Sequence, residues 1–164
     1  MKSHNYQFPK ATFDQTLLLP SLFERQVAKT PDHTAVYFHN NNLTYSQLND
    51  KANAVAHHLI SKGVKPGSLV GLCIERSCDL IIGVLGILKA GAGYVPLDPE
   101  YPQERLQYMM ETAQMPLLLT NKNLFEKLPS GKTEKLLIEN IPQNNSSTSI
   151  NHSSDDIAYV LFTS

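Results

Sequence analysis

The feature that most constrains this chain is an apolar run that ends in a stretch punctuated by glycines. Residues 80–88 are apolar at nearly every position, which is typical of a helix covered on most sides. Lys89 suits the last turn of such a helix, and Gly91 suits its C-terminal stop. Residues 94–97 are too few for another helix, and their aromatic and β-branched side chains favour a strand. The sequence therefore predicts a buried helix, a tight turn and a strand.

A second apolar stretch, residues 69–74, precedes this helix and is also predicted to be a strand. Two strands joined by a helical crossover form a βαβ unit, so these strands should run parallel. The remaining predicted strands cover residues 35–38, 43–44, 117–120, 136–138 and 157–162. The alternation of strands and helices predicts an α/β fold with a doubly wound, mostly parallel sheet flanked by helices.

Local signals mark where the helices begin. Ser21 followed by Glu24 is a capping box that predicts a helix over residues 22–29. Thr44 and Gln47 form a second capping box, for a helix that runs to Lys62. Ser77 or Asp79 can cap the buried helix. Further helices are expected from about Pro102 to Ala113 and over residues 123–128, while residues 35–44 form a hairpin.

Composition excludes several classes of function. With 14 Lys and Arg against 15 Asp and Glu, the formal charge is −1, which argues against nucleic-acid partners and anionic membrane surfaces. No apolar run approaches the roughly 18 residues of a membrane span, and no signal peptide is visible, so we expect a cytoplasmic protein. Cys73, Cys78 and the six histidines show no metal-ligand spacing, which predicts reduced thiols and no metal site.

Two segments lack the pattern of a packed element. Residues 1–20 show no clear periodicity and are expected to be a leader or linker, which leaves residues 21–164 for the folded part. Residues 143–154 are almost entirely polar, so they cannot bury enough apolar surface to order themselves and should form a flexible loop.

The last apolar run, residues 157–162, has the character of a central strand buried on both faces and ends at Thr163 and Ser164. In open parallel sheets, ligands bind beyond the carboxyl ends of the strands, where a phosphate-binding loop would begin. On chemistry alone, these two hydroxyl residues favour a plain strand end over a phosphate-binding role. We also expect the strand to leave an apolar patch or a sheet edge exposed in this chain.

Four motifs resemble successive core motifs of the amino-acid adenylation domains of nonribosomal peptide synthetases, which belong to the adenylate-forming, AMP-dependent ligase superfamily. The motifs are Phe23-Glu24 with Val27 and Thr30-Pro31-Asp32, then residues 43–49, residues 88–99, and residues 156–164. The block at residues 88–99, with Tyr101-Pro102 and Glu104-Arg105-Leu106, is the most specific. The resemblance covers residues 22–164.

This resemblance implies that the chain is the N-terminal portion of such a domain and stops at the phosphate-loop strand. Thr163 and Ser164 match the first two residues of the family's phosphate-binding loop and would offer hydroxyls to ATP. ATP and magnesium would serve the complete domain, but neither is expected to bind this fragment strongly. No catalytic residue and no metal ligand is assigned within residues 1–164.

The resemblance also implies partners and leaves alternatives open. A complete enzyme would activate an amino acid and load it onto the phosphopantetheine thiol of a peptidyl carrier protein, and this fragment would be inactive without the remainder of the domain. A D-alanine–carrier protein ligase or an acyl-CoA ligase is an alternative enzyme. A non-catalytic truncated fragment or a complementing interaction module is an alternative of a different class.

Overall fold

The computed structural model describes residues 18–144, 146–148, 150 and 153–163. Five α-helices are present in this part: α1 Leu19–Lys29, α2 Tyr45–Ser61, α3 Cys78–Lys89, α4 Gln103–Thr112 and α5 Lys122–Phe125. The six strands are β1 Thr34–Phe38, β2 Asn41–Thr44, β3 Leu69–Cys73, β4 Gly93–Pro96, β5 Leu117–Thr120 and β6 Glu134–Leu137. A short 3-10 helix, Ile138–Asn140, follows β6.

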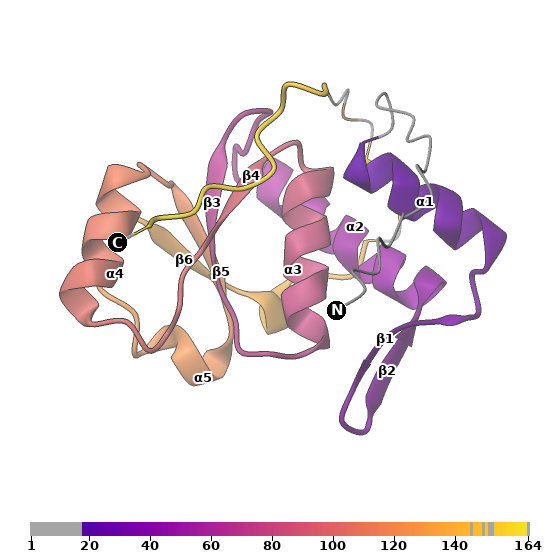
Figure 1. Ribbon diagram of the computed structural model, residues 1–164, viewed down its shortest axis with the longest axis horizontal. Coiled ribbons are helices and arrows are strands. Elements are labelled where there is room, and N and C mark those ends of the chain that lie inside the picture. Colours follow the sequence, from indigo (N-terminus) through magenta and orange to yellow (C-terminus); the bar gives the residue numbers. More distant parts are fainter. Residues whose placement is uncertain (1–17, 145, 149, 151–152, 164) are drawn as a thin grey trace, which may run out of the picture.

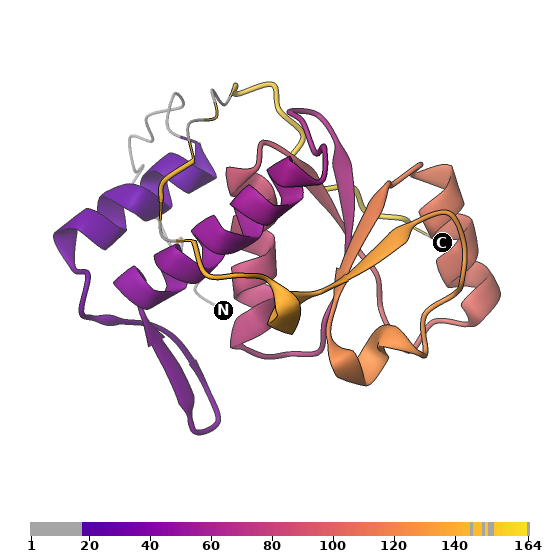
Figure 2. The ribbon, with the colours of Figure 1, turned by 180° about the vertical axis from the view of Figure 1, so that it is seen from behind.

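A four-stranded parallel sheet with the order β4-β3-β5-β6 forms the centre of the molecule. Helices α2 and α3 pack on one face of this sheet, against side chains such as Leu72 and Leu119. Helices α4 and α5 pack on the other face, against Val95 and Leu118. Figures 1 and 2 show these layers from opposite sides. The predicted α/β fold with a mostly parallel sheet flanked by helices is confirmed.

The predicted βαβ unit is present, and its capping residues explain its boundaries. The Ser77 hydroxyl accepts a hydrogen bond from the Leu80 N–H at the start of α3, so Ser77 rather than Asp79 is the cap. At the other end, Gly91 has φ +76°, which a residue with a side chain rarely adopts. The chain can therefore turn directly from α3 into β4.

The first helix begins earlier than the predicted capping box suggests. Helix α1 starts at Leu19 after an N-cap residue, Leu18, whose side chain makes no cap hydrogen bond. Ser21 lies inside the first turn, together with the buried Pro20. Proline near the start of a helix presets φ and has no N–H that needs a partner, so a side-chain cap is dispensable here. The prediction of a helix that starts at residue 22 was wrong by three residues.

The second capping box is confirmed in full. The Thr44 hydroxyl accepts from the Gln47 N–H, and the Gln47 side chain accepts from the Thr44 N–H. Helix α2 then extends to Ser61. The hairpin of β1 and β2 before it is antiparallel and projects away from the sheet (Figure 1).

The C-terminal segment, residues 157–162, corrects one prediction. It lies beside β4 and parallel to it, but it pairs only through a single bridge between Tyr94 and Tyr159. In a regular parallel ladder, the next hydrogen bond would come from the N–H of residue 96, which is Pro96 and has none. The segment is therefore an exposed edge, not a central strand buried on both faces. The predicted exposure of a sheet edge is confirmed, but the prediction of a strand over residues 157–162 was wrong, because the four-stranded sheet does not include them.

The polar stretch 143–154 makes a few contacts where it is described. Nε2 of His57 lies 2.9 Å from the Ser146 carbonyl oxygen. The Thr148 hydroxyl donates to the Lys89 carbonyl oxygen over 3.3 Å. The flexibility of this stretch stays a prediction, and residues 1–17 of the predicted leader 1–20 lie outside the described residues.

Candidate functional site

A hollow of about 620 Å³ lies beyond the carboxyl ends of β3 and β4. Its walls come from the turn after β3, from the loop after β4 and from the last residues of the C-terminal segment, Leu161 and Phe162. This is the edge of a parallel sheet at which ligands bind in open α/β folds. The hollow is therefore the candidate functional site.

The loop after β4 is held rigidly. The Asp98 carboxylate accepts a hydrogen bond from the Glu100 N–H over 2.9 Å, and the Tyr101 N–H donates to the Asp98 carbonyl oxygen over 3.0 Å. The guanidinium of Arg105, in α4, lies 4.2 Å from the centroid of the Tyr101 ring, a cation–π contact that fixes the ring. Pro99 limits the backbone further. The loop is thus a preformed wall of the hollow.

The turn after β3 is tied to the neighbouring strand. Oε2 of Glu75 accepts from the Asn123 side-chain amide over 3.1 Å. Asn123 belongs to α5, which follows β5. This hydrogen bond joins the segments that follow two adjacent strands and so ties one wall of the hollow to α5.

Acidic groups dominate the charge of the hollow. The lining residues include three carboxylates, from Glu75, Asp98 and Glu100, and one cation, Arg76. Burial, and then the Asp98 and Glu75 carboxylates, raise the pKa of the Cys73 thiol to about 12. Cys73 therefore stays protonated near neutral pH, and it is no nucleophile because the thiolate is the reactive form. Both cysteines are free thiols, as predicted.

Thr163, one of the two residues singled out from sequence, directly follows the part of the C-terminal segment that lines the hollow. Thr163 is exposed and lies outside any helix or strand. Ser164 lies outside the described residues. The role of Thr163 and Ser164 in phosphate binding stays a prediction.

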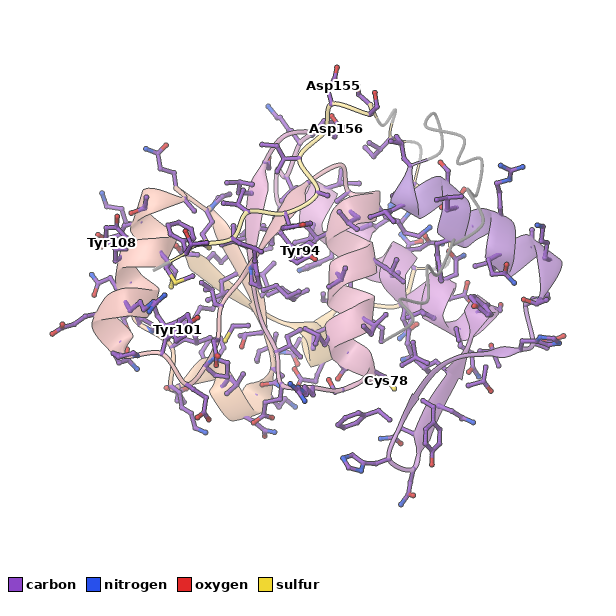
Figure 3. The ribbon with its side chains drawn as sticks, in the orientation of Figure 1. Cys78, Tyr94, Tyr101, Tyr108, Asp155 and Asp156 are labelled. Atoms are coloured by element: carbon purple, nitrogen blue, oxygen red, sulfur yellow. The ribbon has the colours of Figure 1, made fainter. Side chains whose placement is uncertain are left out.

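Close backbone approach and aromatic contacts hold the C-terminal segment in place. A Cβ atom added to Gly93 would lie 2.8 Å from the Ile157 carbonyl oxygen, so β4 and the segment can approach only because residue 93 is glycine. The rings of Tyr94 and Tyr159 lie 5.8 Å apart, and Phe162 meets Tyr108 edge-on. Figure 3 shows Tyr94 and Tyr108 along the path of the segment.

We expect Gly93→Ala to detach the C-terminal segment and leave the rest of the sheet folded. The added methyl group would collide with a backbone atom, which cannot rotate away. Hydrogen exchange of the Tyr94 and Val160 amides, which bridge the two strands, should accelerate by about tenfold or more because local opening would become easier. Gly131→Ala is the matched control, since its Cβ would meet no atom within 4 Å. Unchanged exchange in Gly93→Ala would contradict this account.

Two negative findings apply to the part of the chain that the structure describes. No group of three or more His, Cys, Asp or Glu side chains is arranged to hold a metal ion there. In the same residues, every helix is too short or too polar to cross a bilayer.

The family model of AMP-binding enzymes matches residues 23–164, which is most of the chain. The chain belongs to this family. Within it, the relatives identify the chain as the N-terminal part of a nonribosomal peptide synthetase adenylation domain. One linear gramicidin synthase protein of Brevibacillus parabrevis is 47% identical over 153 residues, or 90% of this chain. Bacitracin synthase 1 of Bacillus licheniformis is 41% identical over 163 residues, or 98% of this chain.

Solved structures agree with this assignment to the AMP-binding family. The nonribosomal peptide synthetase FmoA3, in a form bound to AMPPNP, superimposes with a TM-score of 0.87 at 32% identity over 91% of this chain. The N-terminal subdomain of Klebsiella oxytoca NpsA gives a TM-score of 0.81 at 28% identity over 92% of this chain.

This member of the AMP-binding family spans only a small share of its relatives. It covers 3% of the linear gramicidin synthase protein, 3% of bacitracin synthase 1, 16% of FmoA3 and 39% of the NpsA subdomain. The fold and the family are therefore shown for this segment.

Sequence reasoning missed the lining of the hollow. The motifs identified in the sequence do not include three of its charged residues, Glu75, Arg76 and Glu100. Their signal was positional, because Glu75 and Arg76 directly follow a predicted strand and ligand sites lie beyond such strand ends. The three-dimensional convergence of both loops with residues 161–162 could not be seen without the strand order.

Proposed function

We propose that this chain is the front part of an enzyme that activates an amino acid with ATP for nonribosomal peptide synthesis. The main support is the similarity to peptide synthetases, which reaches 47% identity and covers 90% of the chain. The AMPPNP-bound relative adds support for a nucleotide substrate, since 91% of this chain superimposes on part of that structure.

The proposed reaction has two steps. In the first step, a carboxylate oxygen of the amino acid attacks the α-phosphorus of ATP, and the bond to the leaving pyrophosphate breaks to give an aminoacyl-AMP. In the second step, the phosphopantetheine thiol of a carrier protein attacks the acyl carbon and AMP leaves. The first step needs donors and positive charge around the departing pyrophosphate, which act mainly by electrostatic stabilisation.

Thr163 and Ser164 are the residues of this chain that we assign to the phosphates. The supporting observations are the position of Thr163 at the carboxyl edge of the sheet and its exposure to solvent. A hydroxyl there can donate to a phosphate oxygen. Positive charge must come from elsewhere, because the lining of the hollow carries three carboxylates against one guanidinium. By the resemblance to the family, magnesium would be held by later segments of the complete domain.

In a protein that carries this segment followed by the rest of the domain, we expect Thr163→Ala to reduce amino-acid-dependent ATP–pyrophosphate exchange by about tenfold to a hundredfold, because one donor to the phosphates is lost. Thr163→Ser keeps the hydroxyl and should retain most of the activity. Equal exchange rates for wild type and Thr163→Ala would show that this residue does not contact the phosphates.

For the 164-residue chain alone, we expect no amino-acid-dependent pyrophosphate exchange and no strong binding of ATP. The physical reason is the acidic hollow, whose carboxylates repel the net negative charge that ATP keeps even when magnesium is bound. Exchange assays with a mixture of amino acids, and titration calorimetry with Mg-ATP, provide the measurement. Detectable exchange above a heat-denatured control would refute the expectation.

Partners and location follow from the same proposal. A peptidyl carrier protein would accept the activated amino acid; one relative, NpsA of Klebsiella oxytoca, has been solved as an artificial adenylation–carrier fusion. The remainder of the adenylation domain would cover the exposed C-terminal segment and complete the site. We place the protein in the cytoplasm, where ATP and amino acids are available, without nucleic-acid or membrane partners.

A further inference from the structure

A second hollow, of about 510 Å³, lies at the opposite edge of the sheet from the acidic hollow. Its walls are the last turns of α4, the turn into β5, and the loop of residues 129–133 that leads into β6. These segments stand at the amino ends of the strands. Among the described residues, none after Thr133 lines the second hollow, so the C-terminal segment does not shape it. Its volume is within the range of small-molecule sites, about 300–1,000 Å³.

Backbone contacts hold the two sides of the second hollow together. The Thr133 hydroxyl donates to the Met115 carbonyl oxygen, and the Glu134 N–H donates to the Pro116 carbonyl oxygen, both over 3.0 Å. Gln114, between α4 and β5, has φ +48°, which is uncommon for a residue with a side chain. Such conformations persist where the surrounding structure fixes them, and they cluster at functional sites. The second hollow is therefore formed before any ligand enters it.

The buried part of its lining is apolar, and one wall carries an uncompensated negative charge. Met110, Met115 and Pro129 are buried. The Gln107 side-chain amide donates to the Glu111 carboxylate over 2.9 Å, which orients that carboxylate. Glu111 lies in the last turn of α4, which contains no basic residue. Because a helix C-terminus carries a partial negative charge, Glu111 adds to it, and a cationic group is favoured there.

The loop on the other side contributes one positive charge, from Lys132. No ion pair between described residues joins Lys132 to Glu111, so the two exposed charges do not neutralise each other. A ligand that satisfies both walls carries an ammonium group, a carboxylate and an apolar body. This combination describes an α-amino acid. Methionine side chains adapt to ligands of different shape, and their sulfur atoms contact aromatic rings favourably.

We propose that the second hollow binds a free α-amino acid with a large apolar side chain. The ammonium group of the ligand donates to the Glu111 carboxylate, and its carboxylate accepts from the Lys132 ammonium. Its side chain contacts Met110 and Met115. The site lies at the amino edge of the sheet and needs no ATP, so it does not rest on the proposed function, which stands or falls separately.

Methyl NMR of the 164-residue chain with isotope-labelled methionine methyl groups, titrated with phenylalanine, tests the proposal. We expect the Met110 and Met115 signals to shift saturably, with a dissociation constant of about 1 mM or below. The Met109 signal should stay unchanged, because Met109 lines the acidic hollow instead. Phenethylamine lacks the carboxylate and phenylpropionate lacks the ammonium group, so each should bind about fivefold or more weakly.

Two variants remove one charge each from the second hollow. Glu111→Gln and Lys132→Met change exposed side chains, so the fold should persist, and each should raise the dissociation constant for phenylalanine about fivefold or more. Glu111→Gln should leave the binding of phenylpropionate unchanged, since that ligand has no ammonium group to lose a partner. Glu104→Gln is the matched control, because Glu104 is an exposed carboxylate of α4 outside the lining.

The same titration in a protein that carries this segment followed by the rest of the domain should again shift the Met110 and Met115 signals. Four results would each overturn the proposal. They are the absence of any shift at about 10 mM phenylalanine, shifts confined to Met109, an affinity that Glu111→Gln and Lys132→Met leave unchanged, and binding to the short chain that the longer protein lacks.

Discussion

We expect Gly86→Ala to lower the free energy of unfolding by about 2 kcal/mol, a typical cost of overpacking a core. Gly86 lies in α3 directly against Ala52 and Val55 of α2. A Cβ atom there would lie 2.5 Å from the Val55 Cβ and 3.1 Å from the Ala52 carbonyl oxygen. These atoms belong to the α2 backbone or are fixed directly to it, so no rotamer change relieves the collision. The cost should exceed the gain of up to about 1 kcal/mol in helix propensity.

Gly83→Ala provides the matched control on the same helix. A Cβ there would lie 2.8 Å from a terminal methyl group of Leu72 and 3.2 Å from one of Leu119, and such flexible ends can move. We therefore expect a change within about 1 kcal/mol, since propensity offsets mild crowding. For a chain of this size, about 2 kcal/mol corresponds to a fall of about 4–8 °C in Tm. Equal losses from the two substitutions in urea titrations would contradict this account of the α2–α3 contact.

The contact of α3 with α2 at Gly86 also affects the candidate site. Helix α3 is the crossover between β3 and β4, and the loops that follow these two strands form two walls of the acidic hollow. If α3 shifts away from α2, the crossover and both strand ends must adjust. The small residue between the two helices therefore helps to set the geometry of the candidate site, although it does not line the hollow.

Local sequence signals predicted the fold wherever periodicity and caps agreed. The Thr44–Gln47 capping box, the all-round apolar α3 and the Gly91 stop each specify one backbone conformation independently of their surroundings. Strand β5, residues 117–120, was predicted at its observed bounds. Such signals are local, so a single sequence is sufficient to identify them.

Predictions failed where tertiary context decides. The apolar composition of residues 157–162 indicated a central strand, yet Pro96 on the neighbouring strand ends the ladder after one bridge. Composition describes what a segment could bury, whereas its position at an edge depends on which strands are present beside it. The acidic lining of the hollow was missed for the same reason, because Glu75 and Asp98 belong to different loops that only the strand order brings together.

The burial of Lys89 depends on contacts between helices that the sequence alone does not specify. Its place in the last turn of α3 was predicted from the helix dipole, but its side chain is completely buried. The ammonium pairs with the carboxylate of Glu24 in α1 and lies 6.0 Å from the Phe23 ring centroid. The Glu24 side chain is 45% exposed. A buried cation thus depends on a half-exposed partner from another helix.

We expect Glu24→Ala to cost about 2 kcal/mol, because it leaves a buried ammonium without a counter-charge. This is below the roughly 3–5 kcal/mol typical of breaking a fully buried pair, since water can reach the Glu24 side. Lys89→Met should change stability by less than about 1 kcal/mol, because it keeps most of the buried volume and leaves only a solvated carboxylate. The double variant should then resemble Lys89→Met alone, with the coupling read from a double-mutant cycle in urea.

The ion pair of Lys62 and Glu134 is the matched control, because it has the same type of contact without a buried cation. Its atoms are 2.6 Å apart, but both side chains are substantially exposed, at 38% and 51%. Glu134→Ala should therefore cost no more than about 0.5–1 kcal/mol, and added salt should reduce even that. Two results would contradict this account: equally small losses of stability from Glu24→Ala and Glu134→Ala, or a loss from Lys89→Met as large as that from Glu24→Ala. Either would show that the unpaired buried ammonium of Lys89 is not what destabilises Glu24→Ala. The contrast between the two pairs isolates burial of the cation, because the bond type is the same in both.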